Sequence, residues 1–194
     1  MRKLKIGILG CANIAVRSIL PALELLKDKF EITAIASRDI KKAETLSNIY
    51  NCVPYNDYQS LIESANLDIV YIPLPNSMHF EWIMKSLNKK LHIFCEKSLT
   101  CSSRETEDII NLASSKNLSV IENFQFRFHS QLKFISEIIN NGMIGELRCM
   151  RSSFGFPPFI DKTNIRYEKS LGGGALLDAG AYPIKLSQII LGDN

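Results

Sequence analysis

The feature that most constrains the fold of this chain is an alternation of short apolar runs with longer stretches of helical periodicity. The runs are short enough to be strands and are bounded by turn residues: Leu4–Leu9, Ile32–Ala36, Ile69–Ile72, His92–Cys95 and Ser119–Ile121. The stretches between them have the period of a helix: Ile14–Lys27, Ile40–Tyr50, Tyr58–Ser64, Ser77–Asn88 and Ser102–Ser115. Such an alternation is typical of a parallel sheet covered by helices. We therefore expect residues 1–122 to form an α/β domain with a doubly wound parallel sheet.

After residue 122 the pattern changes. A helix is expected near Gln131–Asn141 and a long strand over Glu146–Phe156, and the glycines Gly172–Gly174 lead into a helical stretch that reaches Leu191. One strand cannot make a stable sheet. We interpret 123–194 as the start of an α+β substrate or oligomerisation domain with a predominantly antiparallel sheet. Its other strands lie in a truncated C-terminal part or come from a partner, so a homo-oligomer through that sheet is an open alternative.

Composition and charge exclude several classes of protein. The net charge of +3 is 23 Lys and Arg minus 20 Asp and Glu, without a block of like charges, so no nucleic-acid partner is indicated. No apolar run approaches the roughly 18 residues of a membrane span, and the one before Cys11 is too short for a signal peptide. The five cysteines form no C-x-x-C pair, which indicates reduced thiols and a cytoplasmic protein. His79, His92 and His129 lack metal-ligand spacing, so no metal is expected.

The first strand runs directly into Gly10–Ala15, a G-x-A-x-x-A sequence at the junction of a strand and a helix. Small residues there let a pyrophosphate approach the backbone, and the helix N-terminus supplies free N–H groups. The pattern predicts a Rossmann-type dinucleotide-binding loop. The alternative is a small-residue turn that binds nothing. The loop residues expected to bind the cofactor are Gly10, Cys11, Ala12, Asn13 and Ile14.

The end of the second strand decides the cofactor. NAD enzymes usually place an acidic residue there for the ribose 2′-hydroxyl, whereas this strand is followed by Ser37 and Arg38. A hydroxyl and a guanidinium suit a 2′-phosphate, with Lys42 as additional support. We therefore favour NADP(H) over NAD(H). Asp39 keeps NAD(H) open, and a solvated helix start is the alternative for the whole segment.

Three further segments make the interpretation specific. They are Tyr71–His79, Cys95–Ser98 and Gly172–Pro183. Together with the loop after the first strand, and in this order, they resemble the glucose-fructose oxidoreductase and inositol dehydrogenase (Gfo/Idh/MocA) family. The chain looks most similar to NADPH-dependent ketoreductases of nucleotide-linked sugars. The resemblance covers essentially the whole chain and implies hydride transfer between NADP(H) and a sugar-like ketone or alcohol, such as a keto-sugar or polyol derivative.

The resemblance also implies a catalytic group at the end of the fourth predicted strand. In the family, the lysine of an E-K-P motif lies at the nicotinamide end of the cofactor and touches the reacting oxygen. This role transfers to Lys97, and Glu96 would orient the nicotinamide end or the lysine. The sequence departs from the pattern at Ser98, where the family has proline, the residue that lowers the cost of a cis bond. The alternative for Lys97 is an exposed surface lysine.

A second group of candidates lies near the end of the chain. Asp178 and Tyr182 are four residues apart in a helical stretch and so share one face. The resemblance makes Tyr182 the proton donor to the substrate, beside the carboxylate of Asp178. The alternative is a tyrosine packed in a helix core. Arg166 would hold a substrate phosphate or hydroxyl, or form a surface ion pair.

The loop after the third predicted strand is expected to lie along the cofactor. Pro73, Leu74 and Asn76 are its candidate contacts. His79 would contact the ribose or the substrate, or would serve only at a helix start. Asn123, after the last strand, would border the substrate pocket or cap a turn.

Two other hypotheses stand beside the oxidoreductase. One is a cofactor-binding regulatory protein without turnover, because the family includes a transcriptional regulator of this fold. The other is an inactive truncated fragment of such an enzyme.

Overall fold

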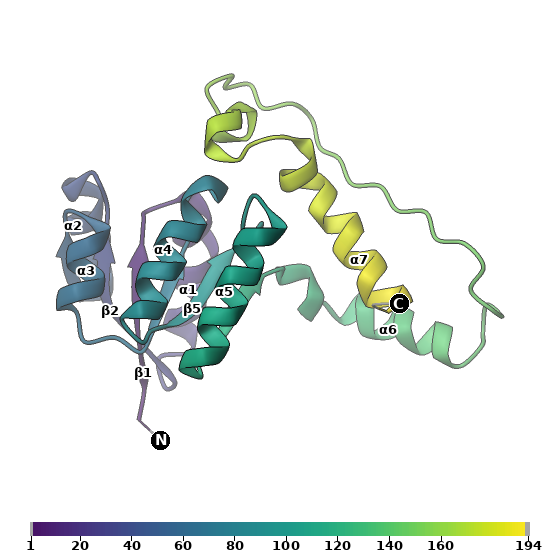
Figure 1. Cartoon of the computed structure of the whole chain (residues 1–194), viewed down its shortest axis with the longest axis horizontal. Coiled ribbons are helices and arrows are strands. Elements are labelled where there is room, and N and C mark those ends of the chain that lie inside the picture. Colours follow the sequence, from purple (N-terminus) through teal and green to yellow (C-terminus); the bar gives the residue numbers. More distant parts are fainter. Residues whose placement is uncertain (1, 193–194) are drawn as a thin grey trace. The chain divides into compact units, whose positions relative to one another are not determined.

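A computed structural model describes residues 2–192 of the chain. It divides the chain into two compact units, Met1–Asn123 and Phe124–Asn194, which we call the first and the second unit. Figure 1 shows that the first unit contains the sheet and that the second consists of helices joined by irregular segments.

The first unit contains one six-stranded sheet in the order β3-β2-β1-β4-β5-β6. All adjacent strands are parallel. The strands are β1 (Leu4–Leu9), β2 (Phe30–Ala36), β3 (Val53–Tyr55), β4 (Ile69–Ile72), β5 (His92–Glu96) and β6 (Val120–Asn123). The order reverses between β1 and β4, which is the arrangement of a doubly wound Rossmann sheet. The predicted fold class of this part is confirmed.

Helices cover both faces of the sheet (Figure 1). They are α1 (Leu20–Leu25), preceded by a π-helical turn (Ala15–Ile19), and α2 (Ile40–Tyr50), α3 (Tyr58–Ser64), α4 (Asn76–Asn88) and α5 (Ser103–Lys116). Buried side chains form two apolar clusters, one on each face. One cluster joins the sheet to α1 and α2, and the other joins it to α3, α4 and α5. The sheet is therefore the centre of two hydrophobic cores.

The local pattern predicted some elements better than others. The bounds of α2, α3 and β4 agree with the predicted ranges. The predicted helix Ile14–Lys27 is shorter and begins with the π-helical turn, and Pro21 lies next to that turn. Proline has no N–H to donate, which disfavours a regular helix across it. The sequence analysis missed β3, a strand of three residues that contains Pro54 and lies at the edge of the sheet, where proline is tolerated.

The second unit has helices but no strand among its described residues. Short helical turns surround two α-helices, α6 (Ser130–Asn140) and α7 (Ala181–Leu191). The prediction of a strand over Glu146–Phe156 is wrong, since these residues form no ladder with other described residues. The predominantly antiparallel sheet expected for this part is likewise not formed by the described residues. The physical reason is that a strand is stabilised by a hydrogen-bonded neighbour, and 124–192 supply none.

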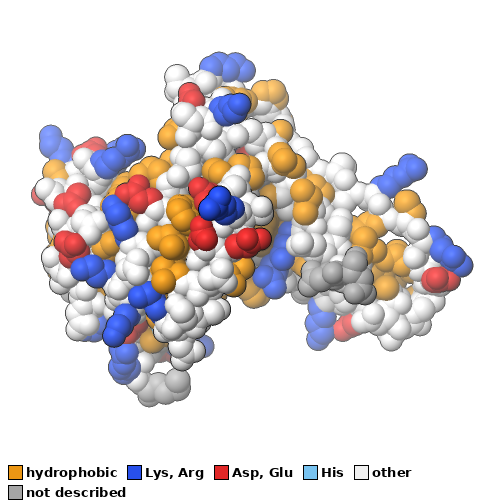
Figure 2. Space-filling view, in the orientation of Figure 1, with side chains coloured by type: hydrophobic (Ala, Val, Ile, Leu, Met, Phe, Trp, Pro, Cys, Tyr) orange, Lys and Arg blue, Asp and Glu red, His pale blue; other side chains and the backbone are white. Residues whose placement is uncertain are grey.

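Charges of both signs are interspersed over the face of the molecule that Figure 2 shows. Within residues 2–192, no helix is long and apolar enough to cross a membrane. The same residues contain no cluster of three or more His, Cys, Asp or Glu side chains arranged to hold a metal ion. All five cysteines are free thiols.

Candidate active site

The loop that follows β1 has a backbone conformation that favours glycine, which lets a ligand come close to the main chain. Gly10 has φ of +112°, and a Cβ built on it would lie 3.0 Å from Cδ2 of Leu74. Its amide donates to the carbonyl of Ala36 at 2.9 Å, so the loop begins against the end of β2. Positive φ with little space beside it favours glycine. The structure therefore explains why Gly10 opens the predicted phosphate loop.

The predicted phosphate loop and the predicted ribose site lie side by side. Leu9 pairs with Ala36 in the sheet, which places the residues that follow each strand next to one another. Burial raises the pKa of the Cys11 thiol, and a hydrogen bond to Ser37 and the charge of Lys42 oppose that shift. The thiol is therefore neutral at neutral pH, and it links Cys11 of the loop to Ser37.

The carboxylate of Asp39 has a hydrogen-bond partner within the protein. It accepts a hydrogen bond from the amide of Lys41 at 3.2 Å and caps the N-terminus of α2. The backbone N–H of Asp39 in turn donates to Oγ of Ser37 at 3.1 Å. Lys41 and Lys42 line a shallow pocket of about 320 Å³ together with Cys11. Positive charge thus surrounds the end of β2, which supports the predicted choice of a 2′-phosphate.

His79 connects the loop after β4 to the segment after β5. It is fully buried near the start of α4, and its Nε2 and Nδ1 each lie 2.8 Å from a carbonyl oxygen, of Leu74 and Ser98 respectively. Burial lowers the pKa of His79, although the two carbonyls oppose that shift. Each ring nitrogen lies against a protein carbonyl, to one of which the neutral ring donates, so the geometry favours the structural alternative for His79 over contact with a ligand.

Two side chains hold the carboxylate of Glu96 in place through hydrogen bonds. The hydroxyl of Tyr71 and Nδ2 of Asn123 both donate to its Oε1 at 2.7 Å. Burial and the charge of Glu96 raise the pKa of Tyr71 far above its ordinary value, so the phenol keeps its proton. Glu96, Asn123 and Tyr71 come from three neighbouring strands, β5, β6 and β4. Glu96 and Asn123, both predicted site residues, are brought together, and Asn123 supports the carboxylate.

Sequence reasoning missed the role of Tyr71. The signal that was available is a phenol inside an otherwise apolar buried strand, because a buried hydroxyl needs a hydrogen-bond partner. Its partner is 25 residues away along the chain, so the strand order had to be known first.

Lys97 follows β5 directly and is partly buried. The peptide bond between Lys97 and Ser98 is cis, with serine where the family pattern has proline. The amide of the next residue, Leu99, donates to Oε1 of Glu122 at 2.8 Å. His79 and Glu122 therefore hold the backbone of the segment that carries Lys97.

The remaining predicted site residues lie in the second unit. Nε of Arg166 is 3.0 Å from Oδ2 of Asp178, so these two residues form an ion pair. Tyr182, near the start of α7, packs against three aromatic rings, with the ring of Phe154 at 4.7 Å and those of Phe124 and Phe126 further away. Tyr182 is partly buried in this aromatic cluster.

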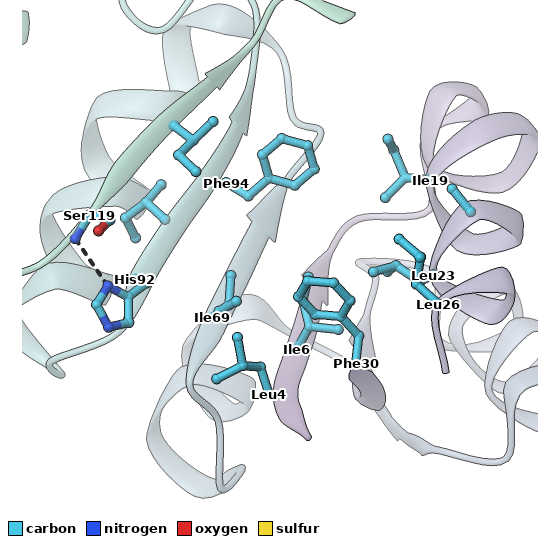
Figure 3. Close-up of a pocket in the computed structure, with 13 residues that line it drawn as sticks. Leu4, Ile6, Ile19, Leu23, Leu26, Phe30, Ile69, His92, Phe94 and Ser119 are labelled. Carbon is cyan, nitrogen blue, oxygen red and sulfur yellow. Dashed lines mark hydrogen bonds between the residues drawn. The ribbon is translucent and has the colours of Figure 1, made fainter. Parts of the chain in front are cut away.

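An apolar groove of the first unit lies elsewhere. It has a volume of about 600 Å³ and lies between the sheet and α1. Figure 3 shows Ile19 and Leu23 pointing toward the strands, and the amide of Ser119 donating to Nδ1 of His92 at 3.0 Å. None of the described predicted site residues line it. The groove between α1 and the sheet is therefore not the candidate active site.

Comparison with known proteins agrees with this geometry. Residues 4–124 match the family described as "Oxidoreductase family, NAD-binding Rossmann fold", and residues 132–194 match the "GFO/IDH/MocA C-terminal domain". The chain belongs to the GFO/IDH/MocA oxidoreductase family. The family resemblance inferred from the motifs is thereby confirmed.

Several relatives within the GFO/IDH/MocA family are sugar reductases or dehydrogenases. A dTDP-3,4-didehydro-2,6-dideoxy-α-D-glucose 3-reductase of Saccharopolyspora spinosa is 43% identical over 192 residues, which cover 98% of this chain and 57% of that protein. A D-xylose 1-dehydrogenase (NADP(+)) of Haloferax volcanii is 33% identical over 187 residues, with 96% and 57% covered. The chain thus spans a little over half the length of these curated relatives.

The solved structure of KijD10, a 3-ketoreductase of Actinomadura kijaniata in complex with NADP and TDP-benzene, has the same fold. It superimposes with a TM-score of 0.93 at 39% sequence identity. The match covers 98% of this chain and 58% of KijD10.

Proposed function

We propose that this chain is the cofactor-binding part, with the start of the substrate domain, of an NADP(H)-dependent oxidoreductase. The reaction is hydride transfer between NADP(H) and a sugar-like ketone or alcohol. We also propose a cytosolic location, on the basis of five free thiols.

One observation carries this proposal: the loop after β1 and the end of β2 lie next to each other. Gly10 bonds to Ala36 at 2.9 Å, and Cys11 is linked to Ser37. One loop offers backbone N–H groups and the N-terminus of a helix to a pyrophosphate, and the other offers Ser37 and Arg38 to a 2′-phosphate. NADP carries both groups, and NAD lacks the second.

The residues present fit the cofactor. At Gly10 the positive φ and the nearby side chain of Leu74 favour glycine, as expected where a phosphate approaches the backbone closely. Lys41 and Lys42 add positive charge at the same end of the sheet. Cys11, Ala12, Asn13 and Ile14 would complete the pyrophosphate loop, and Pro73, Leu74 and Asn76 would line the cofactor on the other side. When bound, NADPH supplies the hydride.

The protein's own contribution is polarisation and proton transfer at the substrate oxygen. We assign polarisation of that oxygen to Lys97 and proton donation to Tyr182. Glu96, the residue before Lys97, is held by Tyr71 and Asn123, so its carboxylate has a fixed position. Asp178 pairs with Arg166 and would keep that guanidinium oriented toward a substrate phosphate or hydroxyl.

The substrate class follows from the relatives. One relative reduces a dTDP-linked keto-sugar, and KijD10 is a 3-ketoreductase solved with TDP-benzene. We propose a nucleoside-diphosphate-linked keto-sugar as the substrate of the protein to which this chain corresponds. A homo-oligomer through the second unit belongs to the same proposal.

The test begins with the cofactor. Isothermal titration of the purified chain with NADPH and, separately, with NADH should give saturable binding that is at least about tenfold tighter for NADPH. A dTDP-linked 3-keto-sugar added to the NADPH complex should then cause loss of NADPH absorbance. Lys97→Met and Tyr182→Phe should abolish this loss while NADPH binding persists. Absence of binding by a folded sample would refute the proposal.

A further inference from the structure

Arg38 is exposed, yet the selectivity assigned to it requires a defined position. A free arginine has many rotamers, and ordering it when a phosphate binds costs affinity. The proposed cofactor preference therefore depends on what holds the guanidinium before the ligand arrives. Tyr58, the first residue of α3, lies where it can hold this guanidinium.

Tyr58 has its hydroxyl at the meeting point of the two cofactor loops. Its side chain is 7% exposed, and its hydroxyl lies 3.8 Å from the position that a Cβ on Gly10 would occupy. Burial raises the pKa of the phenol, and the Arg38 guanidinium opposes that shift through its charge and a hydrogen bond. The phenol is thus neutral and lies beside both Arg38 and the phosphate loop.

The ring of Tyr58 is itself rigidly placed. It packs edge-on against Trp82 with the ring centroids 5.2 Å apart and the planes at 84°. Asp57 caps α3 immediately before it, accepting hydrogen bonds from the amide of Ser60 at 2.7 Å and from its hydroxyl at 2.6 Å. A buried ring at a capped helix start has little freedom. Its hydroxyl therefore has a fixed position from which it can accept a hydrogen bond from the exposed guanidinium of Arg38.

We propose that Tyr58 is a positioning residue for cofactor selectivity, which holds Arg38 beside the phosphate loop in readiness for the 2′-phosphate. The proposal rests on the NADP(H) preference proposed above. Tyr58 does not need to touch the ligand, because its effect passes through Arg38. Removing the hydroxyl should therefore weaken only ligands that carry the 2′-phosphate.

The test uses Tyr58→Phe, which removes the hydroxyl and keeps the ring against Trp82. Calorimetry would measure Kd for four ligands: NADPH, NADH, and the fragments adenosine 2′,5′-bisphosphate and adenosine 5′-phosphate. We expect Kd for NADPH and for the bisphosphate to rise about 10- to 150-fold, the range for a lost hydrogen bond to a charged group acting on binding. Kd for NADH and for adenosine 5′-phosphate should change less than about twofold. Tyr50 lies at the C-terminal end of α2, the end away from Arg38. Tyr50→Phe is therefore the matched control and should leave all four Kd values unchanged.

A double-mutant cycle separates positioning from general damage. In an Arg38→Gln background, which should itself lose most of the NADPH preference, Tyr58→Phe should have no further effect on NADPH binding. Equal losses for NADPH and NADH, or full additivity with Arg38→Gln, would overturn the positioning role. If wild type binds NADH as tightly as NADPH, the proposed function fails first. If wild type prefers NADPH and Tyr58→Phe keeps that preference, only the present inference fails.

Discussion

The two units of the chain differ in how far each one pairs its own strands and buries its own apolar side chains. In the first unit every strand has a parallel neighbour and the buried side chains form two clusters around the sheet. In the second unit, neither α6 nor α7 contains a buried residue, and large apolar side chains such as Phe134 and Ile160 are exposed.

Helices and strands differ in where they find their hydrogen-bond partners. A helix closes its hydrogen bonds within its own segment, so α6 and α7 form without a core around them. A strand needs a neighbour, and the segment 146–156 has none among the described residues. The first unit should therefore carry nearly all of the stability of this chain and all of the cofactor affinity.

The largest effect should come from truncating a core side chain of the first unit. Ile8 lies in the central strand β1 and is fully buried, so Ile8→Ala should lower the free energy of unfolding by about 2–5 kcal/mol. Ile160 in the second unit is 99% exposed, and Ile160→Ala should change it by less than about 0.5 kcal/mol. Urea unfolding followed by circular dichroism would measure both. Similar losses would break the contrast between the units.

Adding a methyl group to a glycine should separate strain from function. Gly10 and Gly174 both have positive φ, +112° and +118°, but only Gly10 has a neighbour within 4 Å of the added Cβ. Gly10→Ala should cost about 1–3 kcal/mol of stability and weaken NADPH binding at least about tenfold. Gly174→Ala should leave NADPH binding unchanged. Calorimetry on both variants would decide, and intact binding by Gly10→Ala would argue against the phosphate loop.

His79 should make the stability of the first unit depend on pH. Burial holds its folded-state pKa below its ordinary value of 6.5, so the unfolded chain takes up the proton first as the pH falls. The free energy of unfolding should therefore be constant with respect to this group above pH 6.5 and decrease below it.

His79→Leu tests this dependence. The variant should lose about 1–3 kcal/mol at neutral pH, because leucine has no N–H to donate to the buried carbonyls. Its stability should also fall less steeply than that of wild type on acidification. Urea midpoints measured from neutral pH to below the ordinary histidine pKa would show the two slopes. Identical slopes at low pH would mean that His79 titrates normally.

The smallest effect should come from the ion pair of the second unit. The side chains of Arg166 and Asp178 are 44% and 15% exposed, and solvent screens such a pair. Arg166→Gln should therefore change the free energy of unfolding by less than about 1 kcal/mol. A thermal melt monitored alongside wild type would detect a larger loss, which would indicate that the second unit contributes more stability than its exposed helices suggest.

Much of the fold was predictable because its signals are local. The periods of Ile40–Tyr50 and Tyr58–Ser64 and the apolar run Ile69–Ile72 set element bounds that the structure confirms. β3 was not predicted, because three residues that include a proline are too few to show the alternation of a strand. The strand predicted over 146–156 failed for the opposite reason, since its pattern was present and its partners were not.

The candidate site divides in the same way. The order of residues along the chain is enough to show which of them follow the strands: Gly10 after β1, Arg38 after β2 and Lys97 after β5. A strand that ends in a turn places the next side chain at the edge of the sheet, whatever the rest of the fold does.

The side chains that support those residues come from distant parts of the chain and are known only from the three-dimensional fold. Tyr71 and Asn123 meet at Glu96 from positions 25 and 27 residues away, and His79 reaches Ser98 across 19. Tyr58, the first residue of α3, reaches Arg38, which lies between β2 and α2. Such contacts depend on strand order and on which face of the sheet each helix covers, and a period in the sequence records neither. The residues proposed to bind a ligand thus carry a local signal in the sequence, and the residues that hold them in place are fixed by long-range packing.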